Sequence, residues 1–192
     1  MMRVRGWLAA ALGAWAMGAQ AAPPTHEALA VPGLQGSAQI VVDRWGIPHI
    51  FAASERDAFF LQGWNAARDR LWQIDLWRKR GLGLLSASFG PAYVEQDRAA
   101  RLLLYRGDMA AEWAAYGPKA QSRAEAFVAG VNAYVGEVRA GRLPLPVEFK
   151  LTASQPELWR PEDVVRIRSH ADRKSTRLNS SHSEISRMPS SA

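Results

Sequence analysis

The stretch from about residue 54 to residue 81 restricts this chain's fold more than any other feature. Its large apolar residues recur at alternating intervals of four and three, which places them on one face of a helix. Ser54 and Asp57 are typical of a helix start, and Gly81 of a helix end. Burying each large apolar side chain contributes about 1.5–3 kcal/mol, so this helix must pack against a sheet or other helices. The apolar face consists of Phe60, Trp64, Ala67, Leu71 and Ile74.

Two extended segments in front of this helix predict a β-hairpin. Residues 39–43 are rich in β-branched side chains, and extended character resumes at 49–51. Between them, Gly46 permits a positive φ and Pro48 lacks a backbone donor, which is typical of a turn.

The rest of the chain predicts further helices. Residues 95–117 are helix-prone up to Gly117, and apolar residues recur with helical spacing over 124–138. Residues 142–149 are expected to be extended, and Pro161 is suited to the first position of a last helix. The fold class is therefore α+β, mostly helical with an N-terminal hairpin.

The net charge of +6 comes mainly from the two ends of the chain. Of 24 Lys and Arg and 18 Asp and Glu, residues 22–171 hold 18 basic and 16 acidic ones. This central part has no basic run with interleaved aromatic residues, which excludes a nucleic-acid partner.

Residues 1–21 have the pattern of a signal peptide. Arg3 and Arg5 precede an apolar run over 6–18, and Ala19-Gln20-Ala21 is a small-x-small cleavage signal. The alternative is a membrane-anchoring helix, but the run is shorter than the roughly 20 residues that a span needs. We predict cleavage after Ala21, a periplasmic or secreted protein and no stable membrane anchor. The chain has no cysteine, so no disulfide stabilises it.

The closing segment, residues 172–192, differs from what precedes it. Serine dominates it, and its few apolar residues have no regular spacing. One interpretation is a natural disordered tail. However, "DRKSTRLNSSH" and "SRMPSSA" resemble translations of a sequencing adapter. We therefore predict that 172–192 is foreign, and that the true sequence differs beyond about residue 171.

Few side chains of residues 22–171 suggest chemistry. His49 could be a base, although a structural histidine beside a turn is commoner. Asp69 and Arg70 could form a catalytic pair or an ion pair that stabilises the long helix. Asp75 and Lys79 are expected on its surface. Trp64, Trp72 and Trp77 could line a pocket, but this spacing is more typical of a core. The four histidines are scattered, and no catalytic, cofactor-binding or metal-ligating residue is assigned.

Four segments carry a more specific signal when taken in order. They are "DRWGIPHIFA", "AFFLQGWNAARDRLWQIDLWRKRGLGLLSASFGP", "FVAGVNAYV" and "LPVEFKLTASQPELWRPEDV". Together, over about residues 38–168, they resemble the start of the penicillin acylase family of bacterial N-terminal-nucleophile hydrolases. Arg68 departs from the glutamine that the family often has at its position.

The resemblance implies a four-layer αββα fold and an exported precursor that is cut into an α and a β subunit. It implies hydrolysis of a linear amide by a serine that begins the β subunit, whose own α-amine serves as the base. Penicillin-like and other N-acyl compounds are the implied substrates, and some members bind structural calcium. None of these functional residues maps onto this chain. Scaffold residues remain: Trp45, Gly46, Pro48 and His49 in the hairpin, and residues 69–73 in the helix.

The sequence therefore predicts residues 22–171 to be a truncated α-subunit region, inactive and poorly folded without its β subunit. An acylase of homoserine lactones is the alternative within enzymes. A periplasmic helical binding module with an exposed aromatic groove is the alternative of another class.

Overall fold

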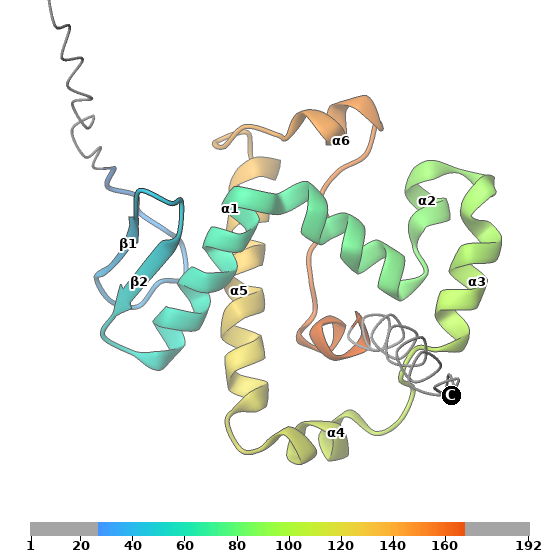
Figure 1. Ribbon diagram of the computed structural model, residues 1–192, viewed down its shortest axis with the longest axis horizontal. Helices are drawn as coiled ribbons and strands as arrows, with labels where there is room; N and C mark the ends of the chain where they lie inside the picture. The colour runs from blue at the N-terminus through green and yellow to red at the C-terminus, as the bar shows by residue number, and fades with distance from the viewer. Residues whose placement is uncertain (1–26, 168–192) are drawn as a thin grey trace, which may run out of the picture. The chain divides into compact units, whose positions relative to one another are not determined.

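The computed structural model describes residues 27–167, of which 31–167 form one compact unit. The signal peptide and the closing segment 172–192 lie outside this range and stay predictions. The elements of this unit confirm a mostly helical fold with an N-terminal hairpin (Figure 1). In order they are β1 (Ala38–Val42), β2 (Pro48–Ala52), α1 (Glu55–Leu82), α2 (Leu85–Phe89), the 3₁₀ turn η1 (Pro91–Tyr93), α3 (Val94–Leu102), α4 (Met109–Tyr116), α5 (Ala120–Arg139) and α6 (Val147–Leu151), and helix resumes at Pro161.

The hairpin is antiparallel, with Ile40 opposite Ile50. Its turn is organised by Asp43, whose Oδ1 accepts the backbone N–H groups of Trp45 at 2.8 Å and Ile47 at 2.9 Å. Gly46 has a φ of +79°, which explains the glycine at this position. The hydrogen bond from the Ile47 backbone, followed by the bond from His49, lowers the pKa of Asp43.

Helix α1 begins as predicted and ends two residues later than predicted. The Ser54 hydroxyl accepts the Asp57 N–H at 3.0 Å. The helix continues past Gly81, and Gly83 ends it in the left-handed conformation, with a φ of +68°. Gly81 is instead a close packing position: a Cβ there would lie 2.9 Å from Ile167 Cγ2.

A kink at Arg70 divides α1, which the sequence pattern did not predict. Arg70 has φ −144° and ψ 32°, outside the helical region, and Figure 1 shows the helix changing direction midway. Residues 64–80 contain no proline and no glycine, the usual causes of a sharp kink. The long apolar face therefore serves two helical arms instead of one straight helix.

The first arm of α1 crosses α5 at two glycines. A Cβ built on Gly63 would lie 1.9 Å from the Phe127 carbonyl oxygen, and one on Gly130 would lie 1.9 Å from that of Phe60. Each helix thus leaves room for the other's backbone. The core around this crossing consists of Trp64, Ala67 and Leu71 of α1, Val128, Val131, Tyr134, Val135 and Val138 of α5, and Phe149 and Trp159.

Two predicted boundaries need correction. The helix-prone stretch 95–117 forms two helices, because residues 103–108 interrupt it and Asp108 caps α4 by accepting the Ala110 N–H. Residues 147–149 were expected to be extended but begin α6, which buries Phe149 in the core. Pro146 does not oppose this helix, because it stands before the first helical turn, and burial of Phe149 stabilises the helix.

Asp97 of α3 holds the start of α2. Its buried carboxylate accepts the backbone N–H groups of Leu85 at 2.9 Å and Ser86 at 2.7 Å. Burial tends to raise the pKa of Asp97, but the bonds from Ser86 and Leu85 and the charge of Arg101 outweigh it and lower the pKa.

Replacing Asp97 with alanine should therefore lower the free energy of unfolding by about 0.5–2 kcal/mol, the usual cost of losing a helix cap. Urea unfolding of the complete, processed protein, followed by tryptophan fluorescence, measures the change. Glu95→Ala is the control, since its side chain is exposed on the same helix and should change stability by no more than about 0.5 kcal/mol. Equal effects of the two substitutions would show that Asp97 caps nothing.

Candidate functional site

His49, the candidate base, lies on the exposed face of the hairpin. Its Nε2 is 3.1 Å from Asp43 Oδ2, the other oxygen of the carboxylate that organises the turn. Among residues 27–167, no serine, threonine or further carboxylate is bonded to it. The pair therefore fixes the hairpin, as expected for a histidine beside a turn.

Asp69 and Arg70 do not form the pair that the sequence suggested. Asp69 accepts from Asn65 Nδ2 at 3.0 Å and lies 3.2 Å from Arg68 Nε, while Arg70 marks the kink. The charged residues Arg68, Asp69 and Arg70 are all exposed, whereas the neutral Asn65 is buried. The cluster can stabilise the helix locally.

The three tryptophans do not form an aromatic groove. Trp64 is buried and packs edge-to-face on Tyr134, with ring centroids 5.1 Å apart. Trp72 is half-buried between Phe149 and Phe89, and Trp77 lies at the surface. Two of the three thus serve the core, as their spacing suggested.

An ionic cluster within the second arm of α1 was missed by the sequence pattern. Asp75 and Lys79 were expected on the surface, but both are buried, with Oδ2 and Nζ 2.9 Å apart. Lys79 also donates to the Gln155 carbonyl, and Asp75 accepts the Glu157 N–H. This part of the expectation was wrong because the segment 155–163 covers that face of the helix.

Arg78 completes the cluster. Its Nε donates to Asp163 Oδ2 at 2.8 Å, and its Nη1 donates to Glu157 Oε2 at 3.1 Å. Asp163 Oδ2 also accepts the Arg160 N–H, so it caps the helix that begins at Pro161. Burial alone would lower the pKa of Arg78, but Asp163 and Glu157 raise it above its ordinary value.

Burial raises the pKa of the Asp75 carboxyl, although the charge and hydrogen bond of Lys79 oppose the shift. A buried carboxylate with a raised pKa is a common feature of active sites. Here, however, the cluster's charges are committed to one another and to backbone groups. Its role is to fasten the segment 155–163 to α1.

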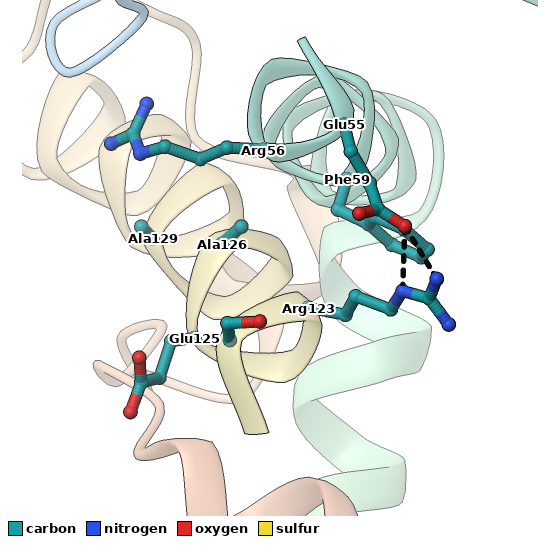
Figure 2. Close-up of a pocket in the computed structure, with 8 residues that line it drawn as sticks. Glu55, Arg56, Phe59, Arg123, Glu125, Ala126 and Ala129 are labelled. Carbon is teal, nitrogen blue, oxygen red and sulfur yellow. Dashed lines mark hydrogen bonds and ion pairs between the residues drawn. The ribbon is translucent and has the colours of Figure 1, made fainter. Parts of the chain in front are cut away.

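One cleft in the described part of the chain lies between the first turns of α1 and α5 and has a volume of about 450 Å³. Figure 2 shows Arg123 turned toward Glu55, and Arg56 extending away from that pair. Glu55 also accepts from Lys119 at 2.9 Å, and hydrogen bonds from Lys119 and then Arg123 lower its pKa. The cleft is lined by Glu55, Arg56, Phe59, Ser122, Arg123, Glu125, Ala126 and Ala129.

The cleft offers little reactivity. Its one hydroxyl, on Ser122, donates to the Lys119 carbonyl, and no base is bonded to it. Arg56 is engaged with Asp57 and with the Gly33 carbonyl. The lining groups thus join the two helices to each other and do not converge on a space for a ligand.

Across residues 27–167, no three histidine or carboxylate side chains are grouped closely enough to ligate a metal ion. The structural calcium that the resemblance implies stays a prediction. In the same range, none of the helices combines the length and hydropathy needed to cross a bilayer.

Asp57 joins the start of α1 to the loop before the hairpin. Its buried carboxylate accepts the Gln35 N–H at 3.2 Å and the Gly36 N–H at 3.0 Å, and Arg56 lies 2.9 Å away. Burial tends to raise the pKa of Asp57, but these partners and Ser54 outweigh it and lower the pKa.

Stability should therefore fall on acidification through Asp57. A carboxyl whose pKa is lowered by folding stabilises the protein above the unfolded pKa of about 3.9, and this contribution is lost as pH falls through the folded pKa. Asp57→Asn should be about 1–3 kcal/mol less stable than wild type at pH 7, and the difference should shrink below about pH 4. Urea unfolding across this pH range tests it, with exposed Glu125→Gln as the control. A difference that stays constant with pH would contradict the role given to Asp57.

Comparison with known proteins shows which family and which structures this chain is similar to. Residues 37–189 match the family model described as penicillin amidase, a range that includes part of the closing segment. The penicillin acylase 2 proenzyme of Pseudomonas sp. (strain SE83) is 38% identical over 147 residues, which are 77% of this chain and 18% of that protein.

The acyl-homoserine lactone acylase QuiP of Pseudomonas aeruginosa is 32% identical over 149 residues, which are 78% of this chain and 17% of that protein. Among solved structures, a thermostable penicillin G acylase from Alcaligenes faecalis has a TM-score of 0.62 and 32% identity. The match covers 68% of this chain and 69% of that one. The chain thus spans less than a fifth of the length of the curated relatives it matches.

Proposed function

The chain belongs to the penicillin amidase family, and on that premise we propose that it is the N-terminal part of a longer, exported precursor that hydrolyses an acyl amide bond. The observation that carries the proposal is the family match over residues 37–189, together with the likeness in fold to a penicillin G acylase. The proposal is that this chain supplies scaffold, since no residue in 27–167 has the contacts of a nucleophile or its base.

The reaction belongs to a second subunit in this proposal. A serine at the start of that subunit attacks the amide carbonyl, and its own α-amine takes up the hydroxyl proton. The C–N bond then breaks, and the α-amine passes the proton to the departing amine. Water hydrolyses the resulting acyl-enzyme ester, which releases the carboxylic acid and regenerates the serine. The name "proenzyme" carried by one relative supports a precursor that is processed. The signal-peptide pattern of residues 1–21 supports export to the periplasm before or during processing.

The experiment is to express the complete gene and incubate the purified product with penicillin G. The proposal predicts two polypeptides by intact-mass analysis, the second beginning with serine, and release of phenylacetic acid with the β-lactam ring intact. An unprocessed single chain that releases no acid from any acyl amide would overturn it.

An acylase of homoserine lactones is the second candidate, because several matched relatives bear that name. Parallel assays with a long-chain N-acyl-homoserine lactone distinguish it. Faster release of the free homoserine lactone than of phenylacetic acid would favour this substrate class over penicillin G.

Residues 22–171 expressed alone should be inactive and should not unfold cooperatively. The physical reason is exposed apolar surface, since Leu102 and Leu151 are each 81% exposed and both terminate short helices. A broad urea transition and binding of a hydrophobic dye are the expected results. A soluble monomer with a sharp, two-state transition would contradict this prediction and favour a free-standing binding module.

A further inference from the structure

The bend of α1 at Arg70 has no cause in the local sequence. Residues 66–73 are mostly strong helix formers, namely alanine, arginine, leucine and glutamine. Residues 64–80 contain no serine or threonine, whose hydroxyls can bond back to a helical carbonyl and bend a helix. Proline and glycine are absent from this stretch as well. These absences point to a contact from elsewhere in the chain as the cause of the bend.

The first arm of α1, residues 55–69, is fixed on α5. Gly63 and Gly130 let the two backbones meet so closely that neither helix can slide along the other without a clash. The second arm, residues 71–82, lies beyond this crossing, and in Figure 1 it leads away from α5. Its direction therefore needs a separate connection to the body that α5 and the first arm form.

Residues 154–160, the strap, are bonded to α5 near their end. They form neither helix nor strand. Asn132 of α5 donates to the Trp159 carbonyl at 2.9 Å and accepts the Trp159 N–H at 2.8 Å. The Trp159 side chain is buried in the same core cluster as Val131 and Val135 of α5. Hydrogen bonds and apolar packing thus both fix this end of the strap to α5.

The beginning of the strap is bonded to the second arm of α1. Lys79 donates to the Gln155 carbonyl at 3.3 Å, and Asp75 accepts the Glu157 N–H at 3.3 Å. Both bonds are made to backbone groups, so they fix the position of the strap itself. The strap therefore connects the second arm to α5.

We propose that the strap is a brace that ties the second arm of α1 to α5, holds α1 bent at Arg70 and lets it straighten when it is released. Trp72 of the second arm also packs on Phe149, but apolar contacts are not directional and leave the angle between the arms free. Hydrogen bonds to the strap are directional and restrict that angle. The bent and straight forms of α1 are thus two states of one element, selected by a segment distant in the sequence. The brace does not depend on the reaction proposed above.

Hydrogen exchange in the complete protein, processed or not, tests the brace. Asn132→Leu keeps the approximate size of the side chain but removes both bonds to Trp159, so the strap should detach. Peptides covering residues 155–160 should then exchange about tenfold faster. Peptides covering residues 71–74 should exchange more slowly, because regular i→i−4 bonds form across residue 70. General unfolding would speed up exchange at both places, so it cannot produce these opposite changes.

Asn65→Leu is the matched control, since it makes the same replacement at a buried residue of the first arm that is bonded to Asp69 beside the bend. It should leave the exchange of the strap unchanged and the bend in place. Asn132→Asp guards against a misfolded Asn132→Leu, because it keeps an oxygen that can accept the Trp159 N–H. It should change exchange in the same two directions, but by less.

A crystal structure of the Asn132→Leu protein reads out the bend itself. Residue 70 should have helical backbone angles, with φ about −63° and ψ about −42°. A strap that exchanges faster while residues 71–74 do not slow down would overturn the proposal, and so would a strap that stays protected in both Asn132 variants. Straightening in Asn65→Leu would overturn it in favour of a local cause of the bend.

Discussion

Gly130→Ala is expected to destabilise the protein by about 3 kcal/mol or more, because the added methyl group has no space. Its Cβ would lie 1.9 Å from the Phe60 carbonyl oxygen and 2.8 Å from the Trp64 nitrogen. These are backbone atoms of a helix, so they cannot move aside as a flexible side chain can. The two helices would have to separate, which would loosen the core along their whole contact.

Gly136→Ala is the matched control on the same helix. A Cβ at this position meets no atom within 4 Å, so alanine should stabilise α5 by about 0.5–1 kcal/mol through its higher helix propensity. Urea unfolding of the complete, processed protein compares the two variants. A Gly130→Ala protein as stable as the Gly136→Ala protein would rule out the close crossing of α1 and α5. Gly63→Ala, at the other side of the crossing, should repeat the effect of Gly130→Ala.

Arg78→Leu should destabilise the protein by about 3–5 kcal/mol, since it removes one partner of a buried ion pair. Asp163 would keep its charge in a buried position without the 2.8 Å bond from Arg78 Nε. Glu157 also loses its bond from Arg78, but its side chain is partly exposed and can be hydrated. The segment 155–163 should then detach from α1, which increased proteolysis near Arg160 would report.

Two further variants separate the buried charge from the shape of the arginine. Arg98→Ala breaks an exposed pair with Glu95 and should cost no more than about 1 kcal/mol. The double variant Arg78→Leu, Asp163→Asn leaves no unpaired charge at either position, keeps a side-chain oxygen that can accept the Arg160 N–H, and should recover part of the loss. A double variant no more stable than Arg78→Leu alone would show that packing by the arginine stem, and not its charge, is what matters.

The elements that could be predicted from sequence are those with local causes. The hairpin follows from a β-branched run, a turn with Gly46 and Pro48, and a return to extended character after it. The start of α1 follows from the Ser54 cap. The buried faces of α1 and α5 follow from the spacing of their apolar residues. The close crossing at two glycines was not predicted, because nothing local pairs Gly63 with Gly130.

The features that were missed have non-local causes. Asp75 and Lys79 are four residues apart, which is usual for a surface pair. They are buried only because the segment 155–163 covers them. One signal was available: Leu71, Trp72, Ile74, Leu76 and Trp77 surround the helix and leave it no wide polar face. The kink at Arg70 has no such signal. The assignment of no catalytic residue remains a prediction.

Long-read sequencing of the genomic DNA across the codons for residues 169–177 tests the central claim most directly. If the chain is the N-terminal part of an amide hydrolase precursor, the reading frame departs from the printed sequence near residue 171. It then continues for several hundred codons, through a serine that can begin a second subunit. A genome that encodes residues 172–192 as printed, followed by a stop codon, would contradict the claim, because the protein would then lack a nucleophile of its own.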